Sequence, residues 1–154
     1  MSDKTREENR RHVEMLFETF NNGDLGRLDD LIAADYAAPQ GGKGPDGFRK
    51  VVVGLRAAFP DIHYIVDETV AEGDRVAVHW HWTGTHRAAF RGFPPTGKVV
   101  SNPGLAVFRL QGGRIVASVL ETDRLGFLQQ IGAVPPNVGL GPGPSPGPTA
   151  SAAQ

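Results

Sequence analysis

The stretch VAVHWHWTGTH, residues 76–86, decides the fold class because its apolar and polar side chains alternate. The apolar side chains fall on one face, and they are Val76, Val78, Trp80 and Trp82. A period of two residues is typical of a β-strand that buries one face and exposes the other. The stretch therefore predicts a strand whose two tryptophans face the interior.

Three neighbouring segments share this period and are predicted to be strands, namely residues 62–67, 98–110 and 114–122. A turn at residues 72–74 and another at residues 112–113 join successive strands, and both turns contain glycine. Strands joined by tight turns pair in the antiparallel sense. The four segments therefore predict one antiparallel sheet.

Upstream of Pro60 the apolar residues recur three and four positions apart, which is typical of amphipathic helices. The pattern predicts a first helix that ends at residues 21–23, where Asn and Gly favour a helix end. It predicts a second helix that starts at an Asp24 cap and runs to Ile32. It predicts a third helix that starts at Pro45.

A last helix is expected after the fourth strand, with Asp123 as its cap and Gly132 at its end. The order of three helices, four strands and one helix indicates an α+β fold, with a curved antiparallel sheet and helices packed on one face. Such an arrangement leaves room for a small ligand between the sheet and the helices.

The chain has 154 residues and a formal charge of −1, which indicates one domain and argues against nucleic-acid binding. The absence of cysteine excludes disulfides, thiolate metal sites and a cysteine nucleophile. No apolar run is long enough to span a bilayer, and the N-terminus has no signal-peptide core, so we expect a cytoplasmic protein without membrane contact. We expect one domain over residues 1–134 and a disordered, Pro/Gly-rich tail over residues 135–154.

The segment GTHRAAFRGFPPTGK, residues 84–98, resembles the GTH…G-x-PPTG segment of the SnoaL-like polyketide cyclases. Further segments follow the order of that family: NNGDLGRLDDLIAADY (21–36), FPDIHY (59–64), GLAVFRL (104–110), GGRIV (112–116) and DRLGFLQQIG (123–132). The resemblance covers about residues 10–134. It implies the cone-like, nuclear-transport-factor-like fold, a deep pocket and often a homodimer formed through the sheet. It also implies cofactor-free ring closure of a polyketide intermediate.

Closing a ring on a poly-β-carbonyl chain requires removal of a proton from a carbon between two carbonyls, stabilisation of the enolate, and a bend that brings the reacting carbons together. Positioning alone supplies a large part of such a rate. A carboxylate or a histidine in a water-poor pocket is a sufficient base. We therefore expect a small polyketide-like substrate as the partner, and neither a cofactor nor a metal.

Strand parity places His86 on the face of Trp80 and Trp82, which makes it the predicted pocket histidine. The alternative is a histidine that binds loop backbone at the end of the strand. His79 and His81 fall on the opposite face, where an outer or dimer-interface position is expected.

The predicted catalytic acids are Glu121 and Asp123, which together with His86 form the candidate catalytic set. The resemblance implies an acid in the last strand, but Leu120 occupies its place and Glu121 comes one residue late. A bulge between Ser118 and Glu121 would turn Glu121 inward. Asp123 has the alternative role of helix cap.

Four residues are predicted to bind substrate. Trp80 and Trp82 are expected to line the cavity floor, Tyr36 to place a phenol at the pocket mouth, and Phe93 to belong to a lid formed by the loop 87–97. Plain core packing and dimer contacts are the alternatives for these side chains. The competing functions are a non-catalytic binder of hydrophobic ligands and an isomerase or hydrolase on the same fold.

Overall fold

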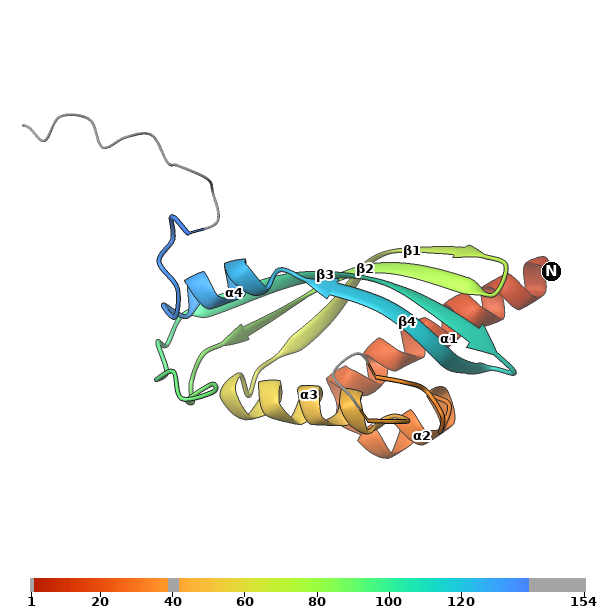
Figure 1. Ribbon diagram of the computed structural model, residues 1–154, viewed down its shortest axis with the longest axis horizontal. Coiled ribbons are helices and arrows are strands. Elements are labelled where there is room, and N and C mark those ends of the chain that lie inside the picture. The colour runs from red at the N-terminus through yellow and green to blue at the C-terminus, as the bar shows by residue number, and fades with distance from the viewer. Residues whose placement is uncertain (1, 39–41, 139–154) are drawn as a thin grey trace, which may run out of the picture.

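The computed structural model describes residues 2–38 and 42–138, and its centre is one curved sheet (Figure 1). The four strands follow one another in the order β1-β2-β3-β4, and each pair is antiparallel. The predicted α+β class and antiparallel sheet are confirmed. The strands are β1 (His63–Glu72), β2 (Arg75–Thr85), β3 (Val99–Gln111) and β4 (Arg114–Thr122).

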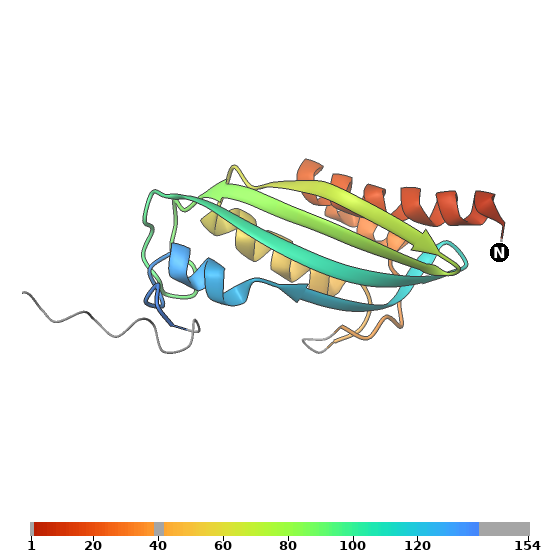
Figure 2. The same cartoon turned by 90° about the horizontal axis from the view of Figure 1, so that it is seen from above.

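The helices gather mainly on one face of this sheet, with the opposite face open to solvent (Figures 1 and 2). In chain order they are α1 (Asp3–Asn22), the single turn η1 (Leu25–Arg27), α2 (Leu28–Leu31), α3 (Asp46–Ala58) and α4 (Arg124–Gln130). The part of the predicted tail from residue 139 onward lies outside the described residues.

The two faces of β2 differ as the alternation predicts. Its inward side chains are buried: Val76, Val78, Trp80 and Trp82. The residues between them are exposed or half-buried. The tryptophans therefore face the helices, and the bare side of the sheet carries the alternate residues.

The predicted end of the first helix is confirmed at Gly23. This residue has a φ of 77°, and its N–H donates to the Thr19 carbonyl at 3.1 Å. Glycine accepts this left-handed conformation without a steric penalty. The inward face of α1 buries Leu16, Phe17 and Phe20 against the sheet.

The predicted second helix forms as the 3₁₀ turn η1 followed directly by the four-residue α2, and it ends at Leu31, one residue before the predicted end. The Asp24 side chain makes no capping hydrogen bond. Ile32 is extended and forms a parallel bridge with Ile115 of β4, and the Ala33 N–H donates to the Ile115 carbonyl at 2.9 Å. The chain therefore passes from α2 directly to the edge of the sheet.

Two arginines fasten α3 along the side that faces α1 and α2. The Arg56 guanidinium donates to the carbonyl of Phe20 at the end of α1. Arg49 donates to the Leu25 carbonyl and to the Asp29 carboxylate, each at 3.2 Å. These contacts hold one long side of α3, and the other long side faces β4.

The last helix closes one end of the sheet. Phe127 packs against Phe59 and Trp82, with ring centroids 5.9 and 5.7 Å apart. The Gln130 amide pairs with both backbone groups of Ser101, at 2.8 and 2.9 Å, beyond the point where β4 ends. The side chain thereby takes the place of a strand partner at this part of the β3 edge.

A carboxylate joins the loop before β1 to the end of β2. Asp61 accepts hydrogen bonds from the Thr85 N–H at 2.6 Å and from the Thr85 hydroxyl at 2.7 Å. These bonds favour the charged form and lower the pKa of Asp61 below its ordinary value of 3.8. The pair therefore contributes stability above pH 3.8 that is lost as the pH falls through the lowered pKa.

Asp61→Ala is expected to lower the free energy of unfolding at pH 7 by about 1 kcal/mol, because two exposed hydrogen bonds are lost. Urea unfolding at pH 7 and at pH 3 measures the effect. The difference from the wild type should shrink at the lower pH. Asp35→Ala removes an exposed carboxylate elsewhere and serves as the control. A difference that stays constant down to pH 3 would contradict this account.

Candidate functional site

A cavity of about 130 Å³ lies between the inner face of the sheet and the helices α1 and α3. Its deep wall is almost entirely aromatic and consists of Phe17, Phe20, Tyr36, Tyr64, Trp80, Trp82 and Phe108. These side chains are buried in the core. The site is therefore a water-poor pocket with flat walls, which suits a planar hydrophobic guest.

The opening of the cavity runs between α3 and β4. Residues of these two elements complete the lining together with Ala38 and Arg124, and all of them except Val52 are more exposed than the deep wall. On the α3 side, Val51 is 48% exposed. On the other side, Leu120 and Thr122 of β4 are half-buried and Arg124 of α4 is exposed. The opening therefore lies along the side of α3 that the two arginines do not hold.

The floor of the cavity depends on a glycine. The Trp80 ring lies on Gly104 of β3, and a Cβ atom at this position would come within 2.2 Å of Trp80 Cζ2. Phe17 packs on the same tryptophan with its ring centroid 5.2 Å away. The indole is thus held between the sheet and α1, as the predicted floor position of Trp80 requires.

A pair of hydroxyl groups interrupts the apolar wall at its deep end. The Tyr36 hydroxyl and the Ser118 hydroxyl lie 2.6 Å apart, and Tyr36 is only 1% exposed. The Tyr36 backbone is held by two bonds, from the Gly44 N–H to its carbonyl and from its own N–H to the Ala33 carbonyl. One hydroxyl hydrogen of the pair can be donated to a ligand oxygen.

The phenol of Tyr36 lies deep in the cavity, whereas the sequence placed it at the mouth. Sequence reasoning assigned no role to Ser118. The inward parity of Leu120 extends to Ser118 two residues earlier, which is the signal that would have found it.

A second phenol, that of Tyr64, also lines the cavity. Burial raises the pKa of Tyr64 well above its usual range, against a smaller opposing effect of the Arg56 charge. The group therefore stays neutral at physiological pH. Asn21 holds its backbone on both sides, at 2.7 and 2.8 Å.

The structure does not bring the predicted acids to the cavity. Leu120 lines the cavity, and Glu121 is exposed on the outer face opposite Leu105. The register shift in this strand pair lies at Arg109/Leu110 of β3, toward the start of β4, so no bulge turns Glu121 inward. Asp123 accepts the Gly126 N–H at 2.8 Å and caps α4, the alternative that the sequence left open.

His86 has the predicted inward direction but does not line the cavity. Its ring is fully buried and stacks on Phe59 at 5.1 Å between centroids. The Thr96 N–H donates to its Nδ1 at 3.3 Å. His86 therefore anchors the loop 87–97.

The remaining histidines of β2 lie on the outer face, as predicted. His81 Nδ1 is 2.8 Å from an Asp67 carboxylate oxygen. Within residues 2–38 and 42–138, no three His, Asp or Glu side chains come together as a metal site would require. No helix of this described part is long and apolar enough to cross a bilayer.

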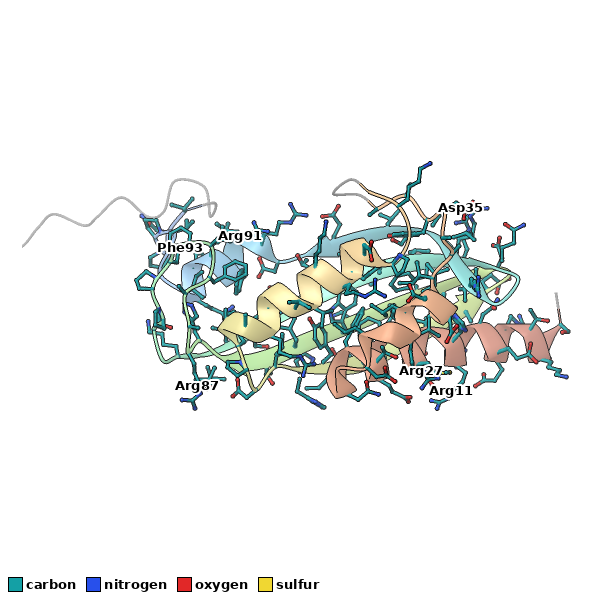
Figure 3. The ribbon with its side chains drawn as sticks, turned by 90° about the horizontal axis from the view of Figure 1, so that it is seen from below. Arg11, Arg27, Asp35, Arg87, Arg91 and Phe93 are labelled. Carbon is teal, nitrogen blue, oxygen red and sulfur yellow. The ribbon has the colours of Figure 1, made fainter. Side chains whose placement is uncertain are left out.

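Phe93 lies at the end of the molecule beside α4, opposite Asp35 (Figure 3). Its side chain is 38% exposed, and its backbone pairs with that of Phe90. Phe90 in turn packs on Phe127 at 5.1 Å. The loop is thus attached to α4, and Phe93 is not part of the cavity wall.

Comparison with known proteins assigns the family. The model of the SnoaL-like polyketide cyclase family matches residues 10–131, which is most of the chain. The chain therefore belongs to the SnoaL-like polyketide cyclase family. A search of curated protein sequences returned no match.

Two of the solved structures that resemble this chain are candidate polyketide cyclases, and a third is a candidate hydroxylase. A candidate polyketide cyclase of Acidithiobacillus ferrooxidans is 32% identical, with 85% of this chain and 97% of that chain covered and a TM-score of 0.71. IdmH, a candidate polyketide cyclase of Streptomyces antibioticus, is 32% identical, with coverage of 80% and 98% and a TM-score of 0.70. AclR, a candidate hydroxylase of Streptomyces galilaeus, is 26% identical, with coverage of 84% and 84% and a TM-score of 0.75.

Gly104→Ala is expected to destabilise the protein by about 1–3 kcal/mol, because the new methyl group displaces the Trp80 ring from the floor. Urea unfolding measures the loss, and tryptophan fluorescence reports the movement. Gly54→Ala is the matched control, since a Cβ on this helical residue meets nothing within 4 Å and alanine favours helix. Equal effects of the two substitutions would contradict the proposed contact.

Proposed function

We propose that this protein closes a ring on a polyketide intermediate by folding it in the aromatic cavity. The observation that carries the proposal is the Tyr36–Ser118 hydroxyl pair at the deep end of an otherwise apolar wall. A polycarbonyl chain offers oxygen atoms to such a pair and apolar carbon to the rings around it. Membership in a family of polyketide cyclases supports the same substrate class.

The proposed reaction is an intramolecular aldol-type closure. A carbon between two carbonyls loses a proton and becomes an enolate, and its carbon forms a bond to a second carbonyl carbon of the same chain. The oxygen of that carbonyl takes up a proton. The walls hold the chain bent, which supplies the effective concentration of the two carbons. The Tyr36–Ser118 pair donates a hydrogen bond to the oxygen that gains charge.

The described lining of the cavity contains neither a carboxylate nor an imidazole. The geometry therefore favours shape and hydrogen bonding over a carboxylate base, and the catalytic roles predicted for Glu121, His86 and Asp123 do not enter the proposed reaction. A carbon acid flanked by two carbonyls is acidic enough to react with water as the base. Such a reaction needs no cofactor.

Tyr36→Phe is expected to lower the rate of cyclisation roughly 100-fold, because the donor to the developing oxyanion is lost. The assay follows conversion of a linear poly-β-carbonyl compound to its cyclic product, with purified protein and no added cofactor. Ser118→Ala should have a smaller effect, since the Tyr36 hydroxyl remains in place. Circular dichroism checks that both variants fold.

Glu121→Gln separates this proposal from catalysis by an acid in the last strand. The outward carboxylate of Glu121 predicts an unchanged rate. A loss of activity in Glu121→Gln together with full activity in Tyr36→Phe would refute the hydroxyl-pair mechanism.

A second candidate is a protein that binds a hydrophobic ligand without changing it. The same lack of a carboxylate or imidazole among the described lining residues favours this alternative. Mass spectrometry of the ligand after incubation decides between the two. A bound polyketide that is recovered unchanged supports the binder, and a cyclised one supports the enzyme.

We further propose that two copies associate through the outer face of the sheet. A row of apolar side chains crosses all four strands on this face, since the register aligns Val70 with Ala77, Ala77 with Val107, and Val107 with Val119. Val70 is 56% exposed and Val119 is 68% exposed. An apolar row of this kind on an uncovered sheet face marks a contact surface.

Sedimentation should give twice the chain mass for the wild type and the chain mass for Val107→Asp, because a buried carboxylate in the middle of the row disfavours association. Val53→Asp is the matched control, since Val53 is 55% exposed on α3, on the other side of the molecule. A wild type that sediments as a monomer at all concentrations would overturn the proposed dimer.

A further inference from the structure

Arg124 brings an uncompensated positive charge to the mouth of the cavity. It is the first residue of α4, it is exposed, and it belongs to the lining. Its guanidinium makes no ion pair or hydrogen bond with any side chain in the part of the chain that the structure describes. Arg49, by contrast, pairs with Asp29 and Asp46.

Among the residues that the structure describes, no Asp or Glu side chain forms an ion pair with Arg124. The acidic residues nearest in sequence are engaged or directed elsewhere, since Asp123 caps α4 and Glu121 is on the outer face. Residues 39–41 and 139–154, which lie outside the described ranges, contain no Asp or Glu. A cation beside an apolar cavity is therefore left for a ligand.

The polar groups lie at the two ends of one wall. Ser118, Leu120 and Thr122 point inward from β4, and Arg124 follows in the same step of two residues. At about 3.3 Å per residue, roughly 13 Å separate the Cα atoms of Ser118 and Thr122. The wall thus has a hydroxyl pair at its deep end, an apolar middle at Leu120, and a hydroxyl and a guanidinium at its mouth.

We infer that the site takes an elongated ligand that ends in a free carboxylate, which binds Arg124 at the mouth. A guanidinium presents parallel N–H donors that match the two oxygens of a carboxylate, and an ester cannot accept in this charged, bidentate way. The inference deepens the proposed function, on which it rests for the polyketide nature of the substrate. According to this inference, Arg124 makes the site bind an acid more tightly than the corresponding ester.

The binding test uses 2-naphthoate and its methyl ester as probes, because both are planar and differ only in the charged end. The chain contains two tryptophans, and both line the cavity, so quenching of their fluorescence reports binding. The wild type should bind the acid about 10-fold more tightly than the ester. Arg124→Gln should abolish this preference, because the affinity for the acid falls while the affinity for the ester stays the same. Arg124→Lys should retain part of the preference.

Arg114→Gln is the matched control. Arg114 is an exposed arginine at the start of β4, outside the cavity lining, and its substitution changes the net charge by the same amount. It should leave the preference for the acid intact. A higher salt concentration should lower the affinity for the acid and leave the affinity for the ester unchanged.

Three outcomes would overturn the inference: equal binding of acid and ester by the wild type, equal losses in Arg124→Gln and Arg114→Gln, or no binding of the acid. None of them touches the proposed function, because cyclisation is measured separately. Loss of cyclisation in Tyr36→Phe with the acid preference retained would support both proposals. If the protein prefers the acid but cyclises no substrate, the carboxylate site is supported and the proposed enzymatic function is refuted.

Discussion

The contact between the Trp80 indole and the bare Cα of Gly104 sets the shape of the molecule's interior. A side chain at Gly104 would occupy the space of the ring, so the indole can lie on the sheet only because β3 carries a glycine there. Phe17 then packs on the ring from α1. The distance between sheet and helix follows from these layers, and the cavity is the space that they leave beside them.

Hydrogen bonds from two guanidinium groups fix the position of α3, in addition to its apolar contacts. Arg49 and Arg56 tie it to the end of α1 and to the turn η1. Nothing comparable among the described residues ties its other side to β4. One side of the helix is therefore closed and the other forms the mouth, where Val51 and Arg124 are exposed. The positions of Arg49 and Arg56 thus determine on which side of α3 the cavity opens.

Local periodicity was sufficient to predict the sheet and its two faces. Trp80 and Trp82 were placed in the cavity from parity alone, because every second residue of a strand shares a face. The choice between Leu120 and Glu121 depended on where the register shifts, which is a property of the β3–β4 pair and not of β4 alone. A sequence read strand by strand cannot supply that position.

The remaining differences have the same origin in distant contacts. The Tyr36–Ser118 pair joins residues 82 positions apart, so no spacing in the sequence marks it. Ile32 pairs with Ile115 of β4, and no local pattern in the sequence connects these two residues. His86 was placed on the correct face, but its neighbour Phe59 fills the space in front of it.

The passage into the cavity crosses no backbone ladder. Among the described residues, the opening lies between α3 and β4, which are not paired strands, and the hydrogen bonds of the sheet run behind the floor. Exchange of a guest therefore demands no melting of strands. Substitutions at exposed positions of the opening, such as Val51, can therefore change which molecules enter the cavity without changing the packing of the buried core.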